Sequence, residues 1–185
     1  MRKIVAGLAI TLDGVVESPS QSGWMLFNDE MAAMISEGTA QSDTILLGRR
    51  TYLEFAALWP HQGSDVPMAG FMNNTPKHVV SSILSHQDTL KWANSHLITG
   101  DLAEAVATLK RQPGKYILIP GSPTLVRSLL RDGLLDELNL MIHPIVVGSG
   151  MRLFEEMTAQ VRLKLVESRT LSTGVLSVTY HPASA

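Results

Sequence analysis

The stretch YILIPGSPTLVRSLLRDG, residues 116–133, decides the fold class. Residues 116–119 form a short apolar run, which is typical of a buried strand. The run stops at Pro120-Gly121, and a helix with apolar residues along one face follows and ends near Gly133. A strand that turns through glycine into a helix is the unit from which α/β proteins are built.

The same order of strand and helix recurs on the N-terminal side of this stretch. Strands are expected at residues 3–11, 44–47, 78–81 and 96–99. Helices are expected at residues 28–40, 49–57 and 102–112, the first capped by Asn28 and the last by Asp101. Residues 60–76 contain Pro, Gly, Asn and Ser and are expected to form a loop.

The C-terminal part has a different order of secondary-structure elements. Residues 136–147, 161–170 and 175–181 are expected to be strands with no helix between them, and Ser172-Thr173-Gly174 predicts a hairpin. We therefore expect one α/β domain over residues 1–185, with strand–helix units first and a mainly antiparallel section after them.

Composition excludes several classes of function. The chain has 185 residues, 45% of them hydrophobic and 17% charged, which is typical of a globular protein. The formal net charge of -2 gives no overall attraction to nucleic acid or to an anionic membrane, so neither partner is expected. No apolar stretch approaches the roughly 20 residues that span a bilayer.

The absence of cysteine excludes disulfides, thiolate metal sites and a cysteine nucleophile, and it fits a reducing cytoplasm. The six histidines form no H-x-x-x-H or H-E-x-x-H pair, so no metal site is expected.

The first candidate site is LGRRT, residues 47–51. A strand ends at Gly48, and a helix begins with the guanidinium groups of Arg49 and Arg50 and the hydroxyl of Thr51. Backbone N–H groups, the positive end of a helix and arginine side chains together favour phosphate. A capped helix with solvated arginines is the alternative interpretation.

The second candidate site is the turn after the strand at 116–119. Gly121 would let a ligand approach the backbone, and Ser122 and Thr124 are placed either to cap the following helix or to bind phosphate oxygens. The segment lacks the lysine of a Walker loop and the spacing of a Rossmann fingerprint. A plain capping turn therefore remains an alternative.

Other polar residues follow strands or open helices. Asp13-Gly14 comes after the first strand, where it is a turn signal that also places a carboxylate at the strand end. Ser81-Ser82 follows the third strand and either meets a phosphate or begins a loop. Asp29 and Glu30 fall in the first turn of a helix, where acidic residues are common.

Several segments together resemble one family. They are AITLDG (9–14), LGRRTY (47–52), GS (121–122), GLLDEL (133–138), HPIVVGSG (143–150) and RLF (152–154), in this order along the chain. The chain resembles the dihydrofolate-reductase-like superfamily. Within it, the chain looks most like stand-alone relatives of the C-terminal reductase domain of the bifunctional riboflavin-biosynthesis deaminase-reductase.

The resemblance implies a dihydrofolate-reductase-like three-layer fold, in which helices flank a mixed, mostly parallel sheet with an antiparallel C-terminal hairpin. It implies NADPH as hydride donor and a small-molecule substrate, and its relatives form homodimers. The cofactor-binding positions that it implies are Ala9 and Gly14 near the nicotinamide, Gly48, Arg49, Arg50 and Thr51 at phosphate, Ser81 and Ser82 near the 2′-phosphate, and Gly121, Ser122, Thr124 and Leu125 toward the pyrophosphate and nicotinamide ribose.

The resemblance also suggests residues on the substrate side. Trp24 is similar to a tryptophan that the riboflavin-pathway reductases carry after the first strand. Asp13 or Asp29 is expected to orient the substrate or to relay a proton. The implied reaction converts a ribosylaminouracil phosphate to its ribityl form, and the zinc-dependent deaminase half is absent because the chain has no cysteine. A pterin or dihydrofolate reductase, and a nucleotide-binding protein without turnover, are the alternative functions.

Overall fold

A computed structural model describes residues 1–17, 23–89, 91–155, 157 and 159–183. The strands are β1 (Ile4–Thr11), β2 (Ser42–Gly48), β3 (Lys77–Val80), β4 (Ser95–Ile98), β5 (Tyr116–Pro120), β6 (Glu137–His143), β7 (Leu163–Thr170) and β8 (Leu176–Pro182). The helices are α1 (Asp29–Ala40), α2 (Arg49–Leu58), α3 (Ala69–Asn74), α4 (His86–Thr89), α5 (Leu102–Arg111) and α6 (Pro123–Arg131), with a 3₁₀ turn at Trp59–His61.

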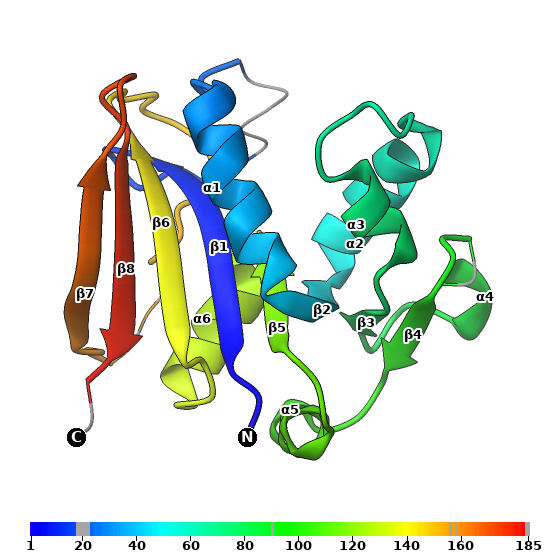
Figure 1. Cartoon of the computed structure of the whole chain (residues 1–185). Helices are drawn as coiled ribbons and strands as arrows, with labels where there is room; N and C mark the ends of the chain where they lie inside the picture. The colour runs from blue at the N-terminus through cyan, green and yellow to red at the C-terminus, as the bar shows by residue number, and fades with distance from the viewer. Residues whose placement is uncertain (18–22, 90, 156, 158, 184–185) are drawn as a thin grey trace.

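The strands of the described residues form one sheet in the order β4-β3-β2-β5-β1-β6-β8-β7 (Figure 1). Neighbouring strands are parallel except at β8, which runs antiparallel to both β6 and β7. This confirms the mixed, mostly parallel sheet with an antiparallel C-terminal hairpin. The carboxyl ends of β1, β2, β3, β5 and β6 consequently lie at one edge of the sheet.

Helices cover both faces of the sheet. In Figure 1, α1 lies in front of the sheet and α6 behind it. The main hydrophobic core joins α5 and α6 to the sheet and takes alternate residues of β1, namely Ile4, Ala6, Leu8 and Ile10. Because side chains alternate along a strand, Ala9 and Thr11 face the other side, where α1 lies. This arrangement confirms the three-layer fold.

Local sequence explains several element boundaries. The side chain of Asn28 accepts the N–H of Met31 at 3.0 Å, and that of Asp101 accepts the N–H of Glu104 at 2.8 Å. Both predicted helix caps are therefore confirmed. Gly174 turns the predicted hairpin with a φ of 82° and donates to the carbonyl of Leu171 at 2.9 Å.

The prediction of a loop over residues 60–76 is wrong in part, because this segment contains α3 and overlaps the 3₁₀ turn at Trp59–His61. Ala69 and Met72 of α3 are buried, and Met72 packs in a second core with Tyr52 and Val79. Tertiary burial therefore overrides the Pro, Gly and Asn signals of this segment. The short helix α4 was also not expected.

The strand expected over residues 136–147 ends at His143. Pro144 has no N–H to donate to a neighbouring strand, and the N–H groups of Val147 and Gly148 donate to the side chain of Asp13 instead. None of the helices in the described ranges has the length and apolar character that a bilayer crossing requires.

Candidate active site

The two glycine turns of the sequence meet at the carboxyl edge of the sheet. The N–H of Gly48 donates to the hydroxyl oxygen of Ser122 at 3.0 Å. A Cβ on Gly48 would lie 3.7 Å from the Cβ atoms of Ser122 and Leu125, and a Cβ on Gly121 would lie 3.6 Å from Cγ2 of Thr51. Gly48, Thr51, Gly121, Ser122 and Leu125 therefore belong to one site.

Sheet topology explains this meeting. β2 and β5 are parallel neighbours, with Ile45 opposite Leu118, so the turns that follow them are also neighbours. α2 and α6 both begin at this edge, and the N-terminus of a helix carries a partial positive charge. Neither Gly48 nor Ser122 caps its helix with a side-chain bond, so this edge presents two uncapped helix N-termini and positive potential, which together favour an anion.

Ser122 has an unusual backbone at this point. Its φ of 58° lies in the left-handed region, which non-glycine residues rarely adopt, and the preceding Gly121 has a φ of 94°. Ser122 precedes α6, but its side chain makes no capping bond to that helix. Its hydroxyl instead holds the turn after β2, so Ser122 links the two turns.

The two arginines at the start of α2 differ in their contacts. Arg50 donates from Nη2 to Oε1 of Glu17 at 2.5 Å and from Nε to Oε1 of Glu54 at 3.1 Å. These two bonds raise the pKa of Arg50 above its ordinary value. Arg49 is exposed and makes no hydrogen bond or ion pair with the described part of the chain.

The remaining predicted phosphate residues lie nearby on the same edge or on α6. Ser81 follows Val80, the residue of β3 opposite Gly48, and its hydroxyl oxygen accepts the N–H groups of Ile83 and Leu84 at 3.1 and 3.0 Å. The oxygen of Ser81 is therefore engaged in a local turn, whereas Ser82 is exposed. Thr124 is exposed in the first turn of α6.

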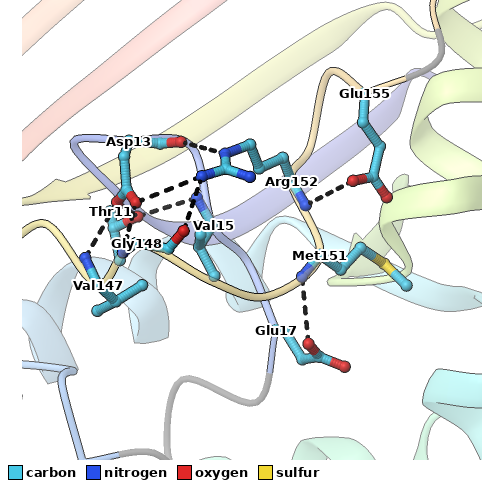
Figure 2. A network of polar contacts seen from close by, with 9 residues as sticks. All are labelled: Thr11, Asp13, Val15, Glu17, Val147, Gly148, Met151, Arg152 and Glu155. Atoms are coloured by element: carbon cyan, nitrogen blue, oxygen red, sulfur yellow. Dashed lines mark hydrogen bonds and ion pairs between the residues drawn. The ribbon is translucent and has the colours of Figure 1, made fainter.

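Asp13 is held in a network between the loop after β1 and the loop after β6 (Figure 2). Its carboxylate accepts the hydroxyl of Thr11 at 2.6 Å and the N–H groups of Val147 and Gly148 at 3.3 and 2.8 Å. The bond from Thr11, followed by those from Gly148 and Val147, outweighs partial desolvation and lowers the pKa of Asp13 to about 2. Asp13 is therefore ionised at neutral pH and accepts hydrogen bonds.

Trp24 and His143 pack together where β6 ends. Their rings meet edge to face with centroids 5.2 Å apart, and His143 is paired with Thr11 across β1 and β6. Nδ1 of His143 accepts the N–H of Leu26 at 3.2 Å, and burial lowers the pKa of the imidazole. Trp24 is thus buried beside the end of β1.

Asp29 is exposed in the first turn of α1, and no described contact joins it to Asp13.

Glu17 at this edge was missed by the sequence analysis, and Thr11 and Arg152 fall in the quoted segments 9–14 and 152–154 but were given no role of their own. Thr11 donates to Asp13 (Figure 2). Arg152 donates to the backbone carbonyls of Asp13 and Gly148 at 3.0 and 3.1 Å. Glu17 accepts the N–H of Met151 at 3.1 Å. The available signal was the glycine pair at 148 and 150, whose φ angles are 81° and 117°. A Cβ at residue 150 would lie 2.9 Å from Cγ1 of Val15, so glycine there allows the two loops to touch.

A cavity of about 340 Å³ lies between α1 and the segment before α3. It is lined by Ala32, Ser36 and Thr39 of α1 and by residues 64–68, Gly70 and Phe71. Asp65 is the only charged side chain among these described lining residues. The cavity volume of about 340 Å³ falls within the range of small-molecule sites.

A larger depression of about 790 Å³ lies at the opposite, amino-terminal edge of the sheet. It is lined by residues 1–2, 40–41 and 110–116. The turns after β2 and β5 are at the other end of the strands, so this depression is separate from the candidate site. Within the described ranges, no three His, Cys, Asp or Glu side chains are grouped as metal ligands.

Comparison with known proteins places the chain among reductase-domain proteins. Residues 2–177 match the family model of the RibD C-terminal domain. The chain is also 31% identical over 184 residues to YyaP, an uncharacterised protein of Bacillus subtilis strain 168, and this match covers 97% of the chain and 95% of YyaP.

Two solved structures have a similar fold. A protein of Shewanella sp. PV-4 assigned to riboflavin biosynthesis superposes with a TM-score of 0.76 at 20% identity, over 100% of both chains. Dihydrofolate reductase of Enterococcus faecalis, in a complex with NADP(H), superposes with a TM-score of 0.65 at 16% identity, over 98% of this chain and 97% of that one. The fold is therefore dihydrofolate-reductase-like, and the chain belongs to the RibD C-terminal domain family.

Proposed function

We propose that residues 1–185 form one domain that acts as an NADPH-dependent reductase of a small heterocyclic or phosphoribosyl substrate. The observation that carries the proposal is the contact between the two glycine turns, where the Gly48 N–H donates to Ser122. This contact creates a single anion-favouring edge from two helix N-termini. Membership of the RibD C-terminal domain family supports a reductase function for this edge.

The residues at this edge fit a dinucleotide with phosphate groups. Gly48 and Gly121 would let a phosphate approach the backbone. The described atoms nearest to a Cβ at these two positions belong to Ser122, Leu125 and Thr51 and include no carboxylate. Arg49 and Arg50 would bind phosphate, Thr51, Ser122, Thr124 and Leu125 would line the turns, and Ser81 and Ser82 would lie toward the 2′-phosphate. Residues Ala9 to Gly14 would lie against the nicotinamide, which supplies a hydride when NADPH is bound.

The substrate side is formed by β1, the loop after it and α1. Asp13 would orient the substrate edge of the site by fixing the loop that contains Val147 and Gly148, and its low pKa suits a role as an acceptor. Asp29, exposed at the start of α1, is the second candidate for orienting the substrate or relaying a proton through water. Trp24 would close this side through its contact with His143.

The first candidate substrate is the one of the family's riboflavin-pathway reductases, a 5-amino-6-(5-phosphoribosylamino)uracil. A specific observation favours a second candidate, a pterin without the two carboxylates of a folate tail. The 340 Å³ cavity has no cation among its described lining residues, so it suits an uncharged heterocycle better than a phosphate.

The protein is further proposed to act in the cytoplasm as a homodimer. Leu165 and Val166 of β7 and Leu176 of β8 are exposed apolar residues on a strand pair at the sheet edge. A second copy of the chain would cover them, since unpaired edge strands favour association. Sedimentation at micromolar concentration would show a dimer, and a monomer there would refute this part of the proposal.

The function is tested by measuring NADPH oxidation with a panel of aminopyrimidine ribosides, their phosphates, and pteridines. Turnover on one class identifies the substrate, whereas tight NADPH binding without turnover on any of them would favour a nucleotide-binding protein. The double variant Arg49→Ala/Arg50→Ala should weaken NADPH more than NADH. An equal loss for both cofactors would contradict a role for these arginines at the 2′-phosphate and would leave a role at the pyrophosphate standing.

A further inference from the structure

We propose that Glu17 sets the affinity for the cofactor, because its carboxylate competes with a cofactor phosphate for the guanidinium of Arg50. The inference rests on the proposed function, in which Arg50 is a phosphate ligand. It adds a residue that neither the sequence motifs nor the family resemblance identifies.

The contact between Glu17 and Arg50 is a short ion pair. Nη2 of Arg50 lies 2.5 Å from Oε1 of Glu17, and Nε of the same guanidinium is bound to Glu54. A guanidinium offers five N–H donors in a fixed plane, and a phosphate prefers two of them together. With one Nη2 hydrogen and the Nε hydrogen directed at carboxylates, a phosphate that binds along the Nε–Nη2 edge of Arg50 must displace Glu17 and Glu54. A phosphate that binds along the other edge, through Nη1 and the second Nη2 hydrogen, meets a guanidinium whose charge Glu17 already neutralises in part.

Glu17 is itself held in place by the opposite loop. Its second oxygen, Oε2, accepts the N–H of Met151 at 3.1 Å. The backbone around it is fixed by bonds from the Val16 N–H to the Met151 carbonyl at 2.9 Å and from the Leu153 N–H to the Gly14 carbonyl at 3.0 Å. The carboxylate would therefore stay beside Arg50 when a phosphate binds and would continue to occupy its Nη2.

The neighbouring Arg49 supplies the contrast within the same motif. Arg49 makes no ion pair with the described residues, whereas Arg50 is 56% exposed but pairs with two carboxylates. The bond from Arg50 also lowers the pKa of Glu17, so the competing carboxylate is charged at neutral pH. The two arginines are consequently unequal, and Arg49 should contribute more to phosphate binding than Arg50.

The test measures NADPH dissociation constants by fluorescence at low ionic strength for the wild type, Glu17→Gln, Arg50→Ala and the double variant. Glutamine keeps an oxygen that can accept the Met151 N–H but removes the negative charge beside Arg50. Because a partly exposed ion pair is weak, Glu17→Gln should tighten NADPH binding about three- to fivefold. In the Arg50→Ala background the same substitution should change nothing.

Glu155→Gln is the matched control. Glu155 lies in the same loop network and binds Arg127 and the N–H of Arg152, but it has no contact with Arg50 among its described bonds. The Glu155→Gln substitution removes one negative charge nearby and should leave the NADPH dissociation constant unchanged. If Glu17→Gln loses the native circular dichroism spectrum, Glu17→Ala carries the same prediction.

Wild-type binding with no gain in Glu17→Gln would overturn the inference and leave the proposed function standing. An equal gain in the Arg50→Ala background, or in Glu155→Gln, would also overturn it, because the effect would then be a general change of charge. Absence of NADPH binding by the wild type, Glu17→Gln and Arg50→Ala alike would instead overturn the proposed function, and this inference with it.

Discussion

Replacing Ser122 tests how the two turns are joined. Ser122→Ala removes the acceptor of the Gly48 N–H at a position where the serine is only 4% exposed, so water cannot readily replace it. An unpaired buried donor costs about 1–3 kcal/mol of unfolding free energy. For a chain of this length, that corresponds to a melting temperature lower by roughly 2–12 °C.

Ser122→Gly separates the hydrogen bond from the backbone strain. Glycine also lacks the hydroxyl, but it relieves the left-handed conformation, which costs other residues about 1–2 kcal/mol. Ser122→Gly should therefore be more stable than Ser122→Ala by about 1 kcal/mol, and both should bind NADPH more weakly than the wild type.

Thermal and urea unfolding, with NADPH titration, measure these effects. Ser128→Ala is the control, because the Ser128 hydroxyl donates to the Thr124 carbonyl on the exposed side of the same helix and its loss should cost less than about 0.5 kcal/mol. The reasoning is refuted if Ser122→Ala is as stable as this control, or if Ser122→Gly is the less stable of the two Ser122 variants.

Three further predictions concern the loops and the second core. Gly150→Ala should lower the unfolding free energy by about 1–3 kcal/mol, because its Cβ would meet Cγ1 of Val15 at 2.9 Å. The loss should exceed that of Gly148→Ala, whose Cβ meets none of the described atoms within 4 Å, and equal losses in urea unfolding would contradict the contact. Because the pKa of Asp13 is lowered to about 2, its contribution to stability should be present above about pH 4 and lost as the pH falls through 2. The unfolding free energy of Asp13→Asn should therefore depend less on pH in this range than that of the wild type, as acid unfolding measures. Burial lowers the pKa of Lys77 to about 8, so between pH 8 and 10.5 the folded state binds fewer protons than the unfolded state. The unfolding free energy of the wild type should therefore rise over this pH range relative to that of Lys77→Met. Parallel curves of unfolding free energy against pH for the two proteins would contradict the lowered pKa.

The strand–helix order could be predicted from local sequence because each unit carries its own signals. The apolar run at 116–119, the cap at Asn28 and the hairpin glycine at Gly174 all act within a few residues. By contrast, α3 depends on burial of Met72 against residues distant in sequence, and the composition of the local segment does not predict such packing.

The candidate site was predictable only in part for the same reason. Strand ends and helix starts placed Gly48, Gly121 and Ser122 at one edge, since parallel neighbours bring their turns together. The pairing of Arg50 with Glu17 and of Asp13 with Gly148 joins residues 33 and 135 positions apart, and no periodicity or motif encodes such partners.

Hydrogen–deuterium exchange with and without NADPH tests most directly whether both turns bind one dinucleotide. NADPH is expected to slow exchange of backbone amides in residues 47–51 and 120–126 at the same cofactor concentration. Protection of only one of these segments by bound NADPH, or protection confined to other parts of the chain, would contradict the account.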